Sequence, residues 1–355
     1  MEKKKLNKTT KSNLITYGMV LAAYLIVQGL IAGNLLSNLM QGLLVPLCVY
    51  IILALTFGFT LMTTEIAIGR KTKLSSTRAY GNIDKRFAFI GPISFIIPVI
   101  ILPYYCVIGG WVIKYVTVFA TGQDMAAADS LFFANFIGQE YAPLVFFFIF
   151  LGLTALIVVL GVEKGIEKVS KYLMPVLILL AIVICIYIMF IPGAGAGIKY
   201  YLLPDFSKFS FKTVCAAMGQ MFYSMSLAMG ILITFGSYMK KDTSIEKSTE
   251  NVEIFDTAIA IMAGLMIIPA VFAFSGGNAE TLKSGPALMF ITIPKVFANM
   301  GFGTAIGIVF FLLVLFAAVT SSIALTESAV STFEDELHWS RKKSTVFMGM
   351  VMLLL

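Results

Sequence analysis

A long apolar run at residues 219–239, GQMFYSMSLAMGILITFGSYM, carries polar side chains in its first half: Gln220, Ser224 and Ser226. Lipid satisfies no hydrogen bond, so a span tolerates such residues only where protein or water surrounds them. One serine alone would bond to its own helix a turn back. Several polar and small residues together favour a broken helix, whose free amides suit a carboxylate and whose free carbonyls suit a cation.

A row of hydroxyl groups, Thr320, Ser321 and Ser322, stands in a second apolar run, FAAVTSSIAL. Consecutive side chains do not all point one way on a helix. Two of these hydroxyls and the carbonyl of Ala317 can nevertheless meet a small hard cation, and such cations prefer oxygen ligands. The pattern therefore predicts a sodium ligand set.

A pair of tyrosines, Tyr104 and Tyr105, follows Pro103 in ILPYYCVIGGW. A phenol in the middle of the membrane can donate a hydrogen bond to a substrate carboxylate. The alternative is a place in the aromatic belt at the membrane surface. The depth of the pair within its run leaves both interpretations open.

These groups lie in a chain of 355 residues that is 59% hydrophobic and only 13% charged, against roughly 25% charged in an average soluble domain. Apolar runs of about 20 residues recur along its length, as expected of an all-helical protein that crosses the membrane many times. We expect about eight spans and the start of a ninth near Ser344. The eight lie near residues 13–37, 42–68, 88–120, 143–162, 171–192, 213–239, 253–275 and 303–333.

The net charge of +7 indicates membrane orientation rather than nucleic-acid binding. Most lysines and arginines lie on one side of the expected spans, before the first and after the second, fourth, sixth and eighth. The positive-inside rule then places the N-terminus in the cytoplasm. The dispersed cysteines predict neither disulfides nor zinc, the single histidine weakens a histidine proton relay, and no nucleotide-binding loop suggests an ATP-driven pump. We expect no enzyme activity.

Several motifs together resemble the neurotransmitter:sodium symporter family, the sodium-coupled amino-acid transporters. They are TEIAIGR, LPYYCVIGGW, GVEKGIEKVSKYLMP, GQMFYSMSLAMGILITFGSYMKK, IPAVFAFSGG and FAAVTSSIAL…FEDELHWSRK, in family order from about residue 42 onward. The resemblance implies the leucine-transporter fold, an inverted-repeat helical bundle with broken first and sixth spans and a substrate site between them. It implies one transporter domain, residues 1–355, that is incomplete at its C-terminus, because the inverted repeats need a tenth span.

The resemblance also implies roles for individual residues. Tyr105 matches the tyrosine that holds the substrate carboxylate, and Tyr223 the aromatic lid that also gates the extracellular side. Further substrate contacts are implied for Gly29, Leu30, Ile101, Ser224, Ser226, Met229, Ser322 and Leu325. Sodium ligands are implied at Ala317, Thr320 and Ser321 for one ion and at Ser224, Asp256 and Asn34 for another. Ser237, Tyr238 and Asp335 match parts of the cytoplasmic gate.

Asp256 and the first span depart from the family pattern. Asp256 stands at the expected start of the seventh span, either as a solvated helix-start carboxylate or beside a sodium ion, where its charge would make chloride unnecessary. The first span reads LIVQGLIAGNLLSNLMQG, in which Gly29-Leu30 and Gly33-Asn34 are separated and the gate arginine is absent. This departure puts transport competence in question.

We therefore expect a bacterial inner-membrane symporter that moves an amino acid inward with one or two sodium ions by alternating access. Met229 predicts an adaptable apolar subsite and a hydrophobic or aromatic substrate. Two alternatives stay open. One is a membrane-bound binding or regulatory relative without ion coupling, and the other a proton-coupled carrier that titrates Asp256 or Glu65. Besides substrate and lipid no partner is implied, and a homodimer is left open.

Overall fold

The structure, a computed structural model, describes residues 44–275 and 286–354, and every regular element among them is a helix. A membrane-spanning chain must satisfy its backbone hydrogen bonds internally, which helices do. The all-helical, multi-span fold expected from the sequence is thus confirmed. Within the described residues, six helical stretches are long and apolar enough to cross a membrane: Leu44–Thr72, Lys85–Ala120, Ala142–Val159, Lys164–Met189, Ile245–Phe274 and Gly303–Leu337.

The remaining expected spans have different outcomes. The first, residues 13–37, lies outside the described residues. The sixth, residues 213–239, consists of two short helices, α12 (Phe211–Ser224) and α13 (Ile231–Tyr238). The start of the ninth is helix α17, which covers Arg341–Leu354 and so begins slightly before the expected Ser344.

The chain folds into two compact units that are interleaved in sequence. Of the described residues, unit 1 holds 45–95 and 205–256, and unit 2 holds most of the rest. Two long helices begin in unit 1 and continue into unit 2: α6 (Ile90–Ala120) and α14 (Ile245–Phe274). Each unit thus combines segments that are far apart along the chain.

Unit 1 is built on the contact between α4 (Phe59–Thr72) and α13. Two glycines allow the helices to touch backbone to backbone. A Cβ atom at Gly69 would lie 1.9 Å from the Ile233 carbonyl oxygen, and one at Gly236 would lie 2.5 Å from that of Ile66. Small residues are how membrane helices achieve such close packing. The other elements of unit 1 are α3 (Leu44–Leu53), η1 (Ala54–Gly58), α5 (Ser76–Ile83), η2 (Lys85–Phe87), η4 (Phe206–Lys208) and α12.

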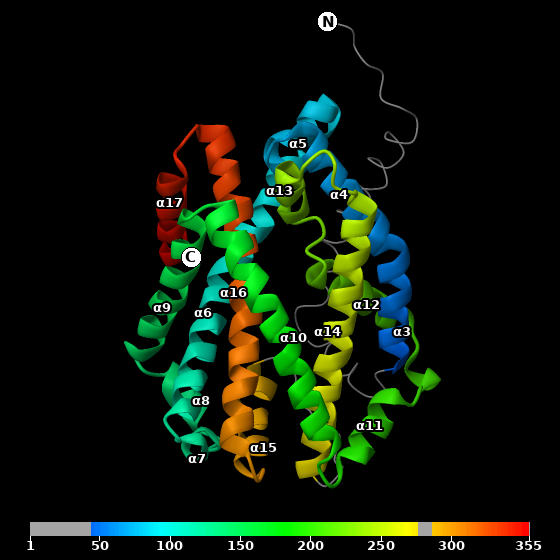
Figure 1. Cartoon of the computed structure of the whole chain (residues 1–355), viewed down its shortest axis with the longest axis vertical. Coiled ribbons are helices and arrows are strands. Elements are labelled where there is room, and N and C mark those ends of the chain that lie inside the picture. The colour runs from blue at the N-terminus through cyan, green and yellow to red at the C-terminus, as the bar shows by residue number, and fades with distance from the viewer. Residues whose placement is uncertain (1–43, 276–285, 355) are drawn as a thin grey trace, which may run out of the picture. The chain divides into compact units, whose positions relative to one another are not determined.

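Unit 2 packs around α16, the longest helix in Figure 1, which runs from Gly303 to Leu337. An aromatic core joins it to α6: the rings of Tyr115 and Phe311 lie 5.1 Å apart, and the Tyr115 hydroxyl donates to the Phe290 carbonyl oxygen at 2.6 Å. Helices α9, α10 and α17 also contact α16. The elements of unit 2 not yet given bounds are α7 (Asp124–Ala127), α8 (Phe132–Ile137), α9 (Ala142–Val159), η3 (Val162–Glu167), α10 (Lys168–Met189), α11 (Ala194–Leu202), η6 (Leu288–Thr292) and α15 (Ile293–Ala298).

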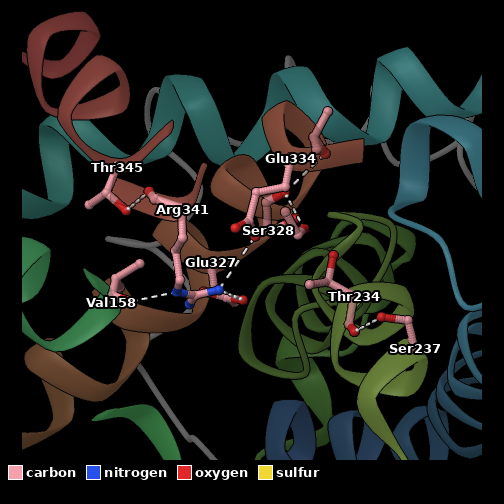
Figure 2. Close-up of polar contacts among 10 residues, drawn as sticks. Val158, Thr234, Ser237, Glu327, Ser328, Glu334, Arg341 and Thr345 are labelled. Carbon is pink, nitrogen blue, oxygen red and sulfur yellow. Dashed lines mark hydrogen bonds and ion pairs between the residues drawn. The ribbon is translucent and has the colours of Figure 1, made fainter. Parts of the chain in front are cut away.

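Arg341 ties three helices of unit 2 together at one end (Figure 2). It forms an ion pair with Glu327 of α16, whose side chain is fully buried. Its Nε donates to the Val158 carbonyl oxygen of α9 at 2.7 Å, and a further nitrogen lies 3.5 Å from Glu334. The guanidinium thus satisfies a buried carboxylate and a carbonyl near the end of α9, while its own backbone starts α17.

We predict that Gly69→Ala destabilises the protein, because the added methyl group must displace the Ile233 backbone. Overpacking of this kind costs about 1–3 kcal/mol. The measurement is thermal unfolding in detergent. Gly152→Ala in α9 is the matched control, since a Cβ atom there meets nothing within 4 Å. Equal melting temperatures for the two variants would contradict the close contact of α4 and α13.

We further predict that Glu327→Ala and Arg341→Ala each destabilise unit 2. Arg341→Ala removes the counter-charge of the buried Glu327, and Glu327→Ala leaves Arg341 with only the longer ion pair to Glu334. Breaking a buried pair costs about 3–5 kcal/mol. The double variant should lose less than the sum of the two, as a double-mutant cycle in denaturant would show. Glu140→Ala, at an exposed glutamate, is the control. Additive losses would rule out the coupling.

Candidate functional site

The sixth span is broken between Ser224 and Ile231, as its serine, glycine and alanine content predicts. Three residues of the break have left-handed backbone angles: Ser226 (φ 55°), Ala228 (φ 60°) and Gly230 (φ 71°). Glycine adopts this conformation readily, but a residue with a Cβ atom is held there only by its surroundings. The break is therefore a built feature of the fold.

Glu65 supports the break from the neighbouring helix α4. Its side chain is fully buried, and Oε1 accepts a hydrogen bond from the backbone N–H of Ala228 at 2.7 Å. A carboxylate is a strong acceptor for a backbone amide. This contact replaces the backbone hydrogen bond that the Ala228 N–H would have made in an unbroken helix. The sequence offered Glu65 only as a candidate proton carrier and did not indicate this contact.

Asp256 forms the second polar centre of unit 1. Its carboxylate accepts hydrogen bonds from the Ser224 hydroxyl at 2.7 Å and the Tyr50 hydroxyl at 2.5 Å. The interpretation of Asp256 as a solvated helix-start residue is wrong, because α14 begins at Ile245 and Asp256 is half-buried within it. Sequence reasoning missed Tyr50, which is 206 residues away along the chain.

In unit 2, α6 brings Tyr105 to the hydroxyl row of α16. The Tyr105 side chain lies close to that of Ser321. Thr320 Oγ1 lies 3.0 Å from the Ala317 carbonyl oxygen, to which it donates. Tyr104, by contrast, is 55% exposed. The two adjacent tyrosines therefore have different environments, and Tyr105 is the one next to the predicted sodium ligands.

Ser322 and Leu325, predicted to contact the substrate, are both buried in unit 2. The Ser322 hydroxyl lies 2.9 Å from the hydroxyl of Thr154 on α9 and 2.9 Å from the Val319 carbonyl oxygen. Thr154, which the sequence gave no reason to select, thus orients Ser322. Ile101, the other predicted substrate contact of unit 2, lies one helical turn before Tyr105 on α6 and is half-buried.

The other predicted site residues are spread over both units. In unit 1, Met229 is buried in the break, whereas Tyr223 and Tyr238 are 37% and 39% exposed. The Ser237 hydroxyl turns back to the Thr234 carbonyl oxygen of its own helix at 2.7 Å (Figure 2). Asp335 of unit 2 is half-buried on α16. Gly29, Leu30 and Asn34 lie outside the described residues.

A family model described as the sodium:neurotransmitter symporter family matches residues 134–355. The uncharacterized sodium-dependent transporter YhdH of Bacillus subtilis is 32% identical over 311 residues, which are 86% of this chain and 68% of the relative. A sodium-dependent transporter of Methanocaldococcus jannaschii is also 32% identical, and the match covers 83% of this chain and 63% of that protein. The chain thus spans about two thirds of the length of these relatives.

A solved structure with the same fold is MhsT in complex with L-phenylalanine. It is 33% identical in sequence with a TM-score of 0.81, and the match covers 94% of this chain and 78% of MhsT. The family match, the relatives and this structure agree with the family that the motifs in the sequence indicate. This chain belongs to the sodium:neurotransmitter symporter family.

Proposed function

We propose that this protein moves an amino acid with an apolar or aromatic side chain across the cytoplasmic membrane, inward with sodium and by alternating access. The observation that supports this most directly is the break at residues 225–230, held by Glu65 and next to the Ser224–Asp256 pair. Irregular backbone at membrane depth is tolerated where it is buried in protein or lines a cavity. A substrate site explains why the chain maintains such a feature.

The substrate proposal rests on four observations. The break exposes backbone groups that suit the charged ends of an amino acid. The motif resemblance implies that Tyr105 of unit 2 holds the substrate carboxylate, and its phenol can donate such a hydrogen bond. Met229 supplies an adaptable apolar surface for the side chain, and the related structure MhsT is in complex with L-phenylalanine.

Two sets of oxygen atoms are suitable ligands for sodium, the ion whose transport is coupled to that of the amino acid. In unit 1, Ser224 and Asp256 offer a hydroxyl and a carboxylate that are already in contact. In unit 2, the Ala317 carbonyl and the Thr320 and Ser321 hydroxyls offer neutral oxygens. One or two sodium ions bind at these two sets of oxygen ligands. The protein needs no chloride, since Asp256 itself supplies a negative charge in a low-dielectric setting.

A proton-coupled carrier is the second candidate, and the specific observation that favours it is the buried Glu65 at the break. Carboxyl groups inside the membrane serve as proton carriers in pumps and transporters. A proton taken up by Glu65 would replace an accepting oxygen with a donating hydroxyl next to the break. Substrate binding that requires acid instead of sodium would support this candidate over the first.

We predict that Thr320→Ala and Ser321→Ala raise the sodium concentration for half-maximal L-phenylalanine binding. The loss of one ligand oxygen should cost about tenfold. The measurement is equilibrium binding of radiolabelled L-phenylalanine to the purified full chain at several sodium concentrations. Thr117→Ala is the control, because it removes a hydroxyl that donates to a carbonyl of its own helix, at 2.6 Å, on an exposed part of α6. Unchanged sodium dependence in both test variants would refute this ligand set.

We also predict that L-phenylalanine binding is indifferent to replacement of chloride by gluconate, and that Asp256→Asn either abolishes binding or makes it chloride-dependent. Asparagine keeps the shape of the side chain but removes its charge. Tyr50→Phe is the matched control, since it removes a donor to Asp256 and keeps the carboxylate. A chloride requirement in the unmodified protein would contradict the role given to Asp256.

A further inference from the structure

Helix α4 ends on a lysine in a conformation that favours glycine. Lys73 is the C-cap of α4 with φ 58° and ψ 31°, and its N–H donates to the Gly69 carbonyl oxygen at 2.8 Å. Helices often end on a left-handed residue, which is usually glycine because glycine has no Cβ atom to clash. The presence of lysine at this position is therefore explained by what its side chain contacts.

The Lys73 ammonium group binds the end of a different helix. Its Nζ donates to the carbonyl oxygens of Ser237 at 2.8 Å and Met239 at 2.6 Å, where α13 ends. The last carbonyls of a helix lack partners within the helix and carry partial negative charge. A lysine supplies both a positive charge and several donors, which fits this position.

A second basic residue of the same turn holds the segment that follows α13. Arg70 donates to the Thr243 carbonyl oxygen at 2.6 Å. Further back along α13, the glycine contacts bring its backbone against α4. Helix α13 has only 8 residues, and so short a helix is not stable in isolation. It therefore depends on α4 along its side and at its C-terminal end.

We propose that Lys73 is a positioning residue that fixes the C-terminal end of α13, and with it the gate residues Ser237 and Tyr238, on α4. The assignment of these two residues to the gate rests on the proposed function. The backbone of α13 contacts α4 before Ser237, and Lys73 and Arg70 bind carbonyl oxygens after Tyr238, those of Met239 and Thr243. The position of Ser237 and Tyr238 is therefore set by α4.

The test is hydrogen–deuterium exchange of the full chain, without ligand, read for the backbone amides of residues 234–244. Lys73→Gly suits the left-handed backbone but removes the ammonium group. Lys73→Asn is a second neutral variant that tolerates the same backbone. Lys73→Arg keeps a charged donor, and Lys71→Met removes a charge from an exposed neighbour on the last turn of α4.

We expect Lys73→Gly and Lys73→Asn to raise exchange in this segment by about twofold to fivefold, the range for an exposed charged contact. Lys73→Arg and Lys71→Met should match the unmodified protein. Unchanged exchange in both neutral Lys73 variants, or an equal rise in Lys71→Met, would overturn the proposal.

A second arm adds sodium and L-phenylalanine. We expect them to slow exchange in this segment of the unmodified protein, and to slow it less in Lys73→Gly than in Lys73→Arg. An equal response in these two variants would overturn the link between Lys73 and the gate. No response even in the unmodified protein would count against the proposed function, while the arm without ligand still decides whether Lys73 holds α13.

Discussion

A helix that breaks inside a membrane must satisfy the backbone groups that the break frees, and the site in this protein follows from how that is done. After Met225 the regular helical hydrogen bonds stop: the N–H groups of Ser226 and Leu227 donate to the carbonyl oxygens of Tyr223 and Phe222, three and five residues back. Ser226 and Ala228 take up left-handed angles. The buried carboxylate of Glu65 accepts from the Ala228 amide. An unsatisfied backbone group in hydrocarbon costs several kcal/mol, and this contact removes that cost at one group of the break.

The same requirement explains why polar side chains from several helices gather near the break. Once Ser224 ends α12, its hydroxyl reaches the Asp256 carboxylate, to which Tyr50 also donates. Neither hydroxyl carries a charge, so Tyr50 and Ser224 supply the carboxylate with no counter-charge. The proposed sodium ion would supply it. A few residues of unit 1 thus both surround the break and carry the proposed chemistry of transport.

Some of this was predictable from local sequence, and some was not. Hydropathy located the spans, and the serines and small residues of 219–239 predicted the break, because both are local properties. Hydropathy predicts too late a start for α14, because it reports the membrane-embedded part of a helix, whereas α14 begins in the polar stretch from Ile245 onward. For the same reason the sequence pattern makes Asp256 look like a helix-start residue, although it lies within the helix.

Contacts between distant segments could not be inferred in this way. Tyr50 with Asp256, Glu65 with Ala228 and Lys73 with the end of α13 each join helices that are far apart in the chain. Thr154 and Arg341 look unremarkable in sequence because only the packing of α9, α16 and α17 gives them partners. The motifs did indicate the family, and through it the residues of the third, sixth and eighth spans, whose roles are still predictions.

Uptake into proteoliposomes tests the central claim most directly. The full chain, reconstituted in vesicles, would be given a panel of radiolabelled amino acids under an inward sodium gradient, an inward potassium gradient or an inward proton gradient. We predict that the sodium gradient alone drives accumulation, with aromatic and large apolar amino acids preferred. Accumulation that the potassium gradient supports equally, or that only the proton gradient drives, would contradict that claim.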